Sequence, residues 1–162
     1  MGAPDLETLL QFEKHFEDAA VEFLESGVGI SCYPSASDTD FVTPRLEVQF
    51  SVQSAMEPVD DPITSTPSLA EGEYRKYEAD LIVQIITDSS AGQTRANHFL
   101  YVGKTRKELL RSSDNWGAVN LPYYALKDLR PTGTERGVEG DFQLTALRYL
   151  AKFAIKADAF PS

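Results

Sequence analysis

Three side chains of this sequence are typical metal ligands or nucleophiles, namely His15, Cys32 and His98. No two of them stand at the spacing of a zinc finger or an HExxH motif, so counting excludes a metal site of either kind. A Cys32–His98 nucleophilic pair would have to be assembled by folding, and no local pattern indicates it. We therefore predict no catalytic, cofactor-binding or metal-binding residue and no cofactor. Both histidines are interpreted as surface residues or as satisfied core residues.

Two further groups of residues could bind a ligand. Asp60 and Asp61 could hold a hard cation, but the twelve-residue calcium-loop pattern is absent, and an acidic segment is more often simply solvated. Trp116, Tyr123 and Tyr124 could stack on a small molecule, although such aromatic residues more often pack in a core or at a sheet edge. The glycine-rich phosphate-binding motifs and the GxSxG hydrolase motif are absent. The motifs therefore favour a protein that is not an enzyme.

Length and composition predict a single globular domain. The chain has 162 residues, of which 42% are hydrophobic and 25% are charged. A net charge of −10 has the wrong sign for a protein that grips phosphate backbones, so we predict no sequence-specific nucleic-acid binding. The lone Cys32 allows no intrachain disulfide and fits an intracellular setting. No signal peptide and no apolar run of membrane-spanning length is apparent, so no membrane association is expected.

The first half of the chain contains one predicted helix and two predicted strands. Apolar residues recur every three or four positions over Asp5–Ser26, which predicts a long helix that starts at Pro4–Asp5 and is stopped by Gly27 and Gly29. Short strands are predicted over Gly29–Tyr33 and, from strict alternation of polar and apolar residues, over Arg45–Gln53. The segment 54–73 contains three prolines and five acidic residues and no Lys or Arg, so it is predicted to be a long loop.

The second half is predicted to contain three strands and one helix. Strands are expected over Tyr74–Thr87, Tyr123–Arg130 and Phe142–Ile155, with a helix over Thr94–Arg111 and an exposed hairpin loop over Thr132–Gly140. The order helix, strand, strand, strand, helix, strand, strand predicts an α+β fold. We expect a single mostly antiparallel or mixed sheet with two helices packed on it, formed by one domain over residues 1–162.

Charge is unevenly distributed along the sequence. The first predicted helix carries seven acidic residues against Lys14, and the long loop carries five acidic residues. The segment Arg95–Arg111 instead carries five basic residues against Glu108. Separated patches of opposite charge allow one copy to meet the next head to tail, and such a heterologous contact builds rings or filaments. Ordinary solvated helix faces are the alternative explanation.

The order of elements resembles that of the tail terminator proteins of long-tailed bacteriophages and prophages, also described as tail completion or minor tail proteins. The likeness covers nearly the whole chain. It rests on four stretches: Leu46–Val52, Tyr77–Ile86, the helix around His98–Leu110, and the closing segment Gln143–Phe153. The loop at 54–73 is long and rich in proline for such a scaffold.

The resemblance implies a non-enzymatic structural protein that forms a ring, typically of six subunits. Such a ring caps the finished tail tube and joins it to the head, so the implied partners are further copies of the chain, tail tube proteins and head connector proteins. The implied location is the bacterial host cytoplasm during assembly and then the virion tail. The acidic loop would line the lumen or the partner-facing rim, because a negative channel repels DNA and lets it slide.

Three alternatives remain open at the level of sequence. The first is a head-side connector, or neck, protein of the same particle. The second is a small-ligand-binding or enzymatic α+β domain with a pocket lined by Trp116, Tyr123 and Tyr124. The third is a peptide-binding adaptor that uses an exposed sheet edge.

Overall fold

A computed structural model of the chain describes residues 11–35, 42–59, 74–110 and 124–156. Its elements are α2 (Phe12–Val28), β1 (Ser31–Pro34), β2 (Arg45–Val59), β3 (Tyr74–Asp88), the 3-10 turn η1 (Ser89–Ala91), α3 (Arg95–Leu110), β4 (Tyr124–Glu139) and β5 (Phe142–Lys156). The predicted order of helices and strands is confirmed, as is the α+β fold class.

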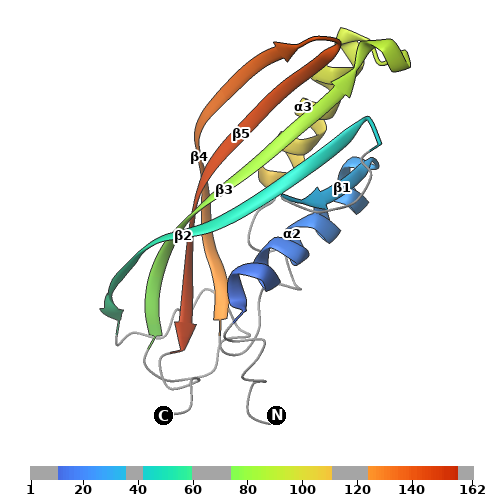
Figure 1. Ribbon diagram of the computed structural model, residues 1–162. Coiled ribbons are helices and arrows are strands. Elements are labelled where there is room, and N and C mark those ends of the chain that lie inside the picture. The colour runs from blue at the N-terminus through green and yellow to red at the C-terminus, as the bar shows by residue number, and fades with distance from the viewer. Residues whose placement is uncertain (1–10, 36–41, 60–73, 111–123, 157–162) are drawn as a thin grey trace.

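The five strands form one sheet in the order β1-β2-β3-β5-β4. Only the β1–β2 pair is parallel, and the other three pairs are antiparallel. Both helices lie on the same side of the sheet, where α2 packs on β1 and β2, α3 packs on β3 and β5, and the helices touch each other. The opposite face of the sheet is not covered by either helix (Figure 1).

The core follows from the alternation of side chains along the strands. Thr145, Leu147, Tyr149, Ala151, Phe153 and Ile155 are all buried, which confirms the predicted inward set of β5. Phe153 lies at the centre of an aromatic cluster, with its ring centroid 5.0 Å from that of Phe16 and 5.7 Å from that of Phe50. This cluster joins α2 to the middle of the sheet.

Hydrogen bonds between neighbouring residues cap the C-terminal end of α2 and the N-terminal end of α3, and one predicted helix stop is wrong. Gly29 adopts a left-handed conformation (φ 84°) and its N–H donates to the carbonyl oxygen of Glu25, which closes α2 as predicted. The prediction that Gly27 also stops the helix is wrong, because α2 continues to Val28. Thr94 caps α3: its hydroxyl accepts from the N–H of Asn97, while the Asn97 side chain accepts from the N–H of Thr94.

The two glycines inside helices are expected to respond in opposite ways to alanine. A Cβ at Gly27 would lie 2.6 Å from Cδ of the buried Glu108 side chain, whereas a Cβ at Gly103 would meet no atom within 4 Å. We expect Gly103→Ala to raise the free energy of unfolding by up to about 1 kcal/mol, because alanine costs less backbone entropy in a helix. Gly27→Ala should lower it by about 1 kcal/mol or more through overpacking. Thermal unfolding of the two variants checks both signs, and equal shifts would contradict the α2–α3 contact.

Two predicted loops are strands in the structure. The loop predicted over 54–73 is wrong for 54–59, which continue β2, while residues 60–73 lie outside the described residues. Within the described part of the chain, β2 is an edge strand beyond the short β1, and a proline such as Pro58 is tolerated in an edge strand because one side of the strand makes no ladder bonds.

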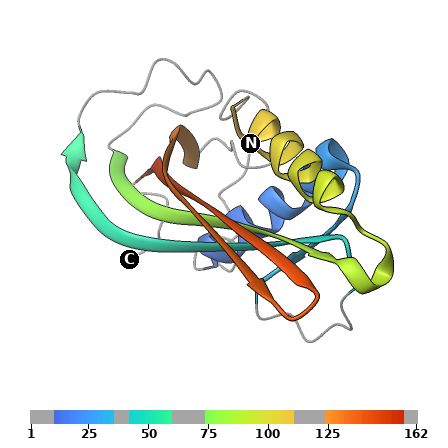
Figure 2. The ribbon, with the colours of Figure 1, turned by 90° about the horizontal axis from the view of Figure 1, so that it is seen from above.

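The exposed hairpin loop predicted over Thr132–Gly140 is also wrong. β4 continues to Glu139, its pairing with β5 runs as far as Glu139–Phe142, and the turn consists of Gly140 and Asp141 alone. The sequence resembles a loop because all residues from Pro131 to Asp141 are exposed, so no buried face imposes a hydrophobic pattern. Figure 2 shows this hairpin extending away from α2.

Candidate functional site

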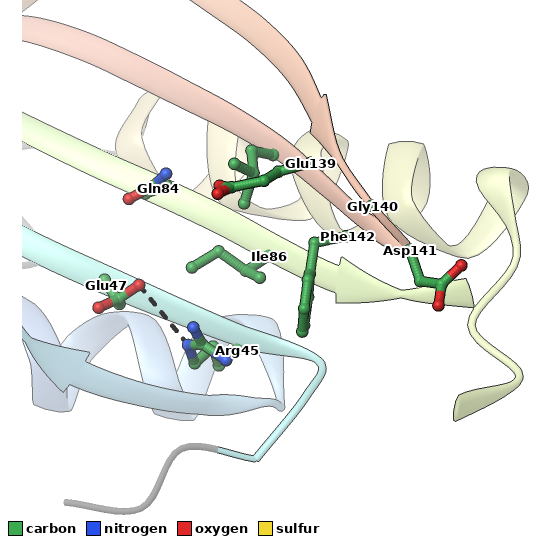
Figure 3. Close-up of a pocket in the computed structure, with 9 residues that line it drawn as sticks. Arg45, Glu47, Gln84, Ile86, Glu139, Gly140, Asp141 and Phe142 are labelled. Atoms are coloured by element: carbon green, nitrogen blue, oxygen red, sulfur yellow. Dashed lines mark ion pairs between the residues drawn. The ribbon is translucent and has the colours of Figure 1, made fainter. Parts of the chain in front are cut away.

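The hairpin end of the sheet carries a hollow on the face that the helices leave uncovered (Figure 3). Its volume is about 490 Å³, and its lining includes Arg45, Glu47, Ile86, Glu139, Asp141 and Phe142. Strand pairing brings these residues together. Arg45 of β2 lies opposite Ile86 of β3, and Ile86 lies opposite Leu144 of β5. The hollow therefore brings together residues of β2, β3, β4 and β5 at one end of these strands.

The floor of the hollow is apolar and its rim is charged. Ile86 is only 3% exposed although it faces the uncovered side, and the ring of Phe142 beside it stays 39% exposed. Arg45 Nε lies 3.5 Å from Glu47 Oε2, and both side chains are mostly buried. Within the described residues, the carboxylates of Glu139 and Asp141 form no ion pair, so the rim carries excess negative charge.

The opposite side of the same hairpin is positively charged. The guanidinium of Arg95 lies 5.1 Å from the ring centroid of Phe99, and that of Arg136 lies 4.7 Å from the same centroid. Arg106 donates from Nη2 to the hydroxyl of Thr134 at 3.1 Å. These contacts fix α3 against β4 and gather three arginines from two elements that are distant in the sequence.

The outer side of α3 adds lysines and exposed apolar side chains to this positive region. Leu100 is 51% exposed and Leu110 is 79% exposed, and Lys104 and Lys107 stand between them. Glu108, the one acidic residue of α3, is buried. The accessible surface of α3 is therefore apolar and cationic.

The acidic residues of α2 are largely engaged within the chain. Glu17 Oε2 accepts from the N–H of Phe50 at 3.1 Å, and Glu13 Oε2 accepts from the N–H of Val52 at 3.0 Å. These two N–H groups belong to β2 beyond the end of β1, so the carboxylates satisfy a sheet edge that has no neighbouring strand among the described residues. Burial raises the pKa of Glu17. The charge count of this helix alone thus overstates the negative surface available to a partner.

His98 is held between two hydroxyl groups in the core. Its Nδ1 lies 2.8 Å from Thr87 Oγ1 and its Nε2 lies 2.7 Å from Thr145 Oγ1. Burial, and secondarily the charge of Arg136, lowers the pKa of His98. His98 therefore joins α3 to β3 and β5 as a neutral core residue. Of the two interpretations of this histidine from the sequence, a surface residue or a satisfied core residue, the second is confirmed.

Of the remaining candidate ligand-binding and catalytic residues, the structure describes only some. Cys32 is buried on β1, and its N–H faces a carboxylate oxygen of Glu25 at 3.4 Å. Asp60, Asp61, Trp116 and Tyr123 lie outside the described residues, as does the side chain of Tyr124. Over 11–35, 42–59, 74–110 and 124–156 no three His, Cys, Asp or Glu side chains group as metal ligands. In the same ranges no helix is long and apolar enough to cross a membrane.

The thiol of Cys32 is expected to be unreactive in the folded protein. Burial raises its pKa to about 12, whereas thiol attack on an alkylating reagent requires the thiolate. At pH 8 we expect iodoacetamide to label the folded chain on the order of a thousandfold more slowly than the urea-unfolded chain. Mass spectrometry of timed samples measures both rates, and fast labelling of the folded chain would contradict the burial of the Cys32 side chain.

Sequence reasoning missed the charged residues of the hairpin, because it assigned them to a loop. A signal was present: Gly140–Asp141 directly precedes the predicted strand Phe142–Ile155. A two-residue Gly-Asp turn before a strand is typical of a β-hairpin. Side-chain alternation along β4 separates the charges, since Arg136 faces α3 and Glu139 faces the hollow.

No family model matches this sequence, and no curated protein matches it. Among solved structures, the fold is similar to that of a chain from the virion of a native gene transfer agent particle. The two chains superpose with a TM-score of 0.56 at 15% sequence identity, over 87% of this chain and 96% of that chain. At this level of identity, the comparison shows that the two chains share a fold.

Proposed function

We propose that this chain is a non-enzymatic structural protein of a phage or phage-derived particle. The observation that carries the proposal is the shared fold with a chain of a gene transfer agent virion, which extends over 96% of that chain. The finer proposal is a tail terminator, a ring that caps the tail tube and joins it to the head. The predicted order of elements, which led to this family from the sequence, is the order found in the structure.

The surface supports assembly rather than catalysis. A cationic and apolar face lies on the helix side of the hairpin end, and an acidic hollow lies on its other side. Surfaces of opposite charge on opposite sides of one subunit favour a heterologous contact, which closes into a ring when the rotation between subunits permits. This arrangement needs neither a cofactor nor a metal ion.

The proposed partners are further copies of the chain, tail tube proteins and head connector proteins. The proposed location is the host cytoplasm during assembly and the virion tail afterwards, with no membrane and no sequence-specific nucleic acid involved. A head-side connector of the same particle is the alternative within this proposal. The shared fold supports both roles equally.

Light scattering over a series of protein and salt concentrations, with negative-stain microscopy of any large species, tests the proposal. We expect a species near 107 kDa, six times the 17.9 kDa of one chain, whose share falls as salt screens the charged contact. Mixing that species with uncapped tail tubes and, separately, with tail-less heads distinguishes the two roles. A protein that stays monomeric alone and on both assemblies would contradict the proposal.

A further inference from the structure

We infer that the acidic hollow at the hairpin end receives the outer side of α3 from a second copy of the chain. This inference rests on the proposed ring, and it names the two surfaces that would form each contact. The hollow is defined by Ile86, Phe142, Glu139 and Asp141 together with the Arg45–Glu47 pair. The α3 ridge is defined by Leu100, Gly103, Lys104, Lys107 and Leu110.

The α3 ridge has the geometry of an inserting surface. Each of positions 100, 103, 104, 107 and 110 lies three or four residues from another member of the set, so they form one stripe along the helix. All five residues are exposed, and Gly103 has open space above it, which permits close approach of another chain. The exposed leucines supply apolar area, and the two lysines supply charge at the middle of the stripe.

The hollow offers the complementary features. The ring of Phe142, which stays 39% exposed beside the buried Ile86, offers apolar surface that a leucine side chain can cover. Glu139 and Asp141 both line the hollow and bring two carboxylates to its rim. In the contact that we infer, these carboxylates pair with the lysines that flank the leucines. Arg45 is paired with Glu47, so it does not cancel the charge of the rim.

The second acidic surface of the chain is a poorer partner for the ridge. On α2, Glu13, Glu17 and Glu25 face backbone N–H groups of the same chain, and Asp18 lies 2.6 Å from Lys14. Using the glutamates for a partner would leave sheet-edge N–H groups without acceptors. A partner bound at the hollow would not have to break ion pairs of the chain, because the rim carboxylates form none within the described part of the chain.

The contact is heterologous, since the ridge lies on the helix side of the sheet and the hollow lies on the uncovered side. Each copy therefore keeps one surface of each kind available for a further neighbour. This property makes charge reversal a sharp test. A ridge variant, Lys104→Glu with Lys107→Glu, has two acidic surfaces, whereas a hollow variant, Glu139→Lys with Asp141→Lys, has two basic surfaces.

We expect each variant alone to lose assembly, with the concentration for half-assembly rising at least about tenfold, because like charges then face each other. An equimolar mixture of the two variants should regain wild-type assembly, since every contact again pairs opposite charges. The matched control is Asp18→Lys with Glu22→Lys, which changes the net charge of α2 by the same amount and should shift half-assembly by about twofold or less. Analytical ultracentrifugation measures the wild-type chain and these four samples, and circular dichroism checks that each variant is folded.

The outcomes separate this inference from the proposed function. If the ridge variant and the hollow variant each form rings as readily as the wild-type chain, the ridge–hollow contact is overturned and the proposed ring stands. Loss of assembly in the α2 control alone would assign the contact to the acidic face of α2. A wild-type chain that never assembles would overturn the proposed function and this inference together.

Discussion

Phe153→Ala is expected to lower the free energy of unfolding by about 3–5 kcal/mol, which is the usual cost of truncating a fully buried phenylalanine. Phe153 is 0% exposed, and its ring contacts those of Phe12, Phe16, Phe50 and Tyr77. The variant removes the residue that links α2 to β2, β3 and β5, so no neighbour can refill the space without moving the helix. Urea unfolding followed by circular dichroism measures the loss.

Phe142→Ala is the matched control for this experiment. Phe142 lies on the same strand but is 39% exposed on the uncovered face, so the same truncation removes much less buried area. We expect it to cost less than about half as much as Phe153→Ala. Equal losses would contradict the placement of the core on the helix side of the sheet.

His98→Ala is expected to be the second most damaging substitution, with a loss of about 2–4 kcal/mol. The change removes two short hydrogen bonds and leaves the buried hydroxyls of Thr87 and Thr145 without their imidazole partner. A double-mutant cycle with Thr145→Val isolates one of these bonds. We expect a coupling energy of at least about 0.5 kcal/mol, and strictly additive losses would contradict the contact.

His98 should also make stability depend on pH. Burial lowers its folded pKa below the ordinary value of 6.5, so at pH values between the two the unfolded chain binds a proton that the folded chain does not. The free energy of unfolding should therefore fall as pH is lowered from 7.5 through 6.5 toward the folded pKa. His98→Gln removes this contribution while His15 stays in both proteins, so the variant should give a flatter profile. Parallel profiles would contradict a neutral buried His98.

The fold was predictable wherever a segment has one buried face. β3, β5 and α3 show hydrophobic periods of two or about 3.6 residues, and they were placed within a residue or two of their true bounds. The distal half of β4 has no buried residue, although Thr134 and Arg136 contact α3, and its polar sequence was therefore interpreted as a loop. The end of β2 was missed for a related reason, since its proline is acceptable only at a sheet edge.

The proposed binding surfaces were only half predictable. The positive charge of α3 is a local property of sixteen consecutive residues, so the sequence indicated it directly. The hollow combines Arg45 with Glu139 and Phe142, which lie about a hundred positions apart and meet only through the pairing of β2, β3, β5 and β4.

Local sequence determined the α+β class, the order of elements and the inward faces, because hydrophobic period and helix caps act over a few neighbouring residues. Tertiary structure alone decided which charges are available to a partner. It directs the glutamates of α2 to the edge of β2, and it places Glu139 and Arg136 on opposite sides of one strand. The physical reason is that a charge count does not reveal which carboxylates hydrogen-bond within the fold, and strand register sets the side of the sheet that each side chain faces.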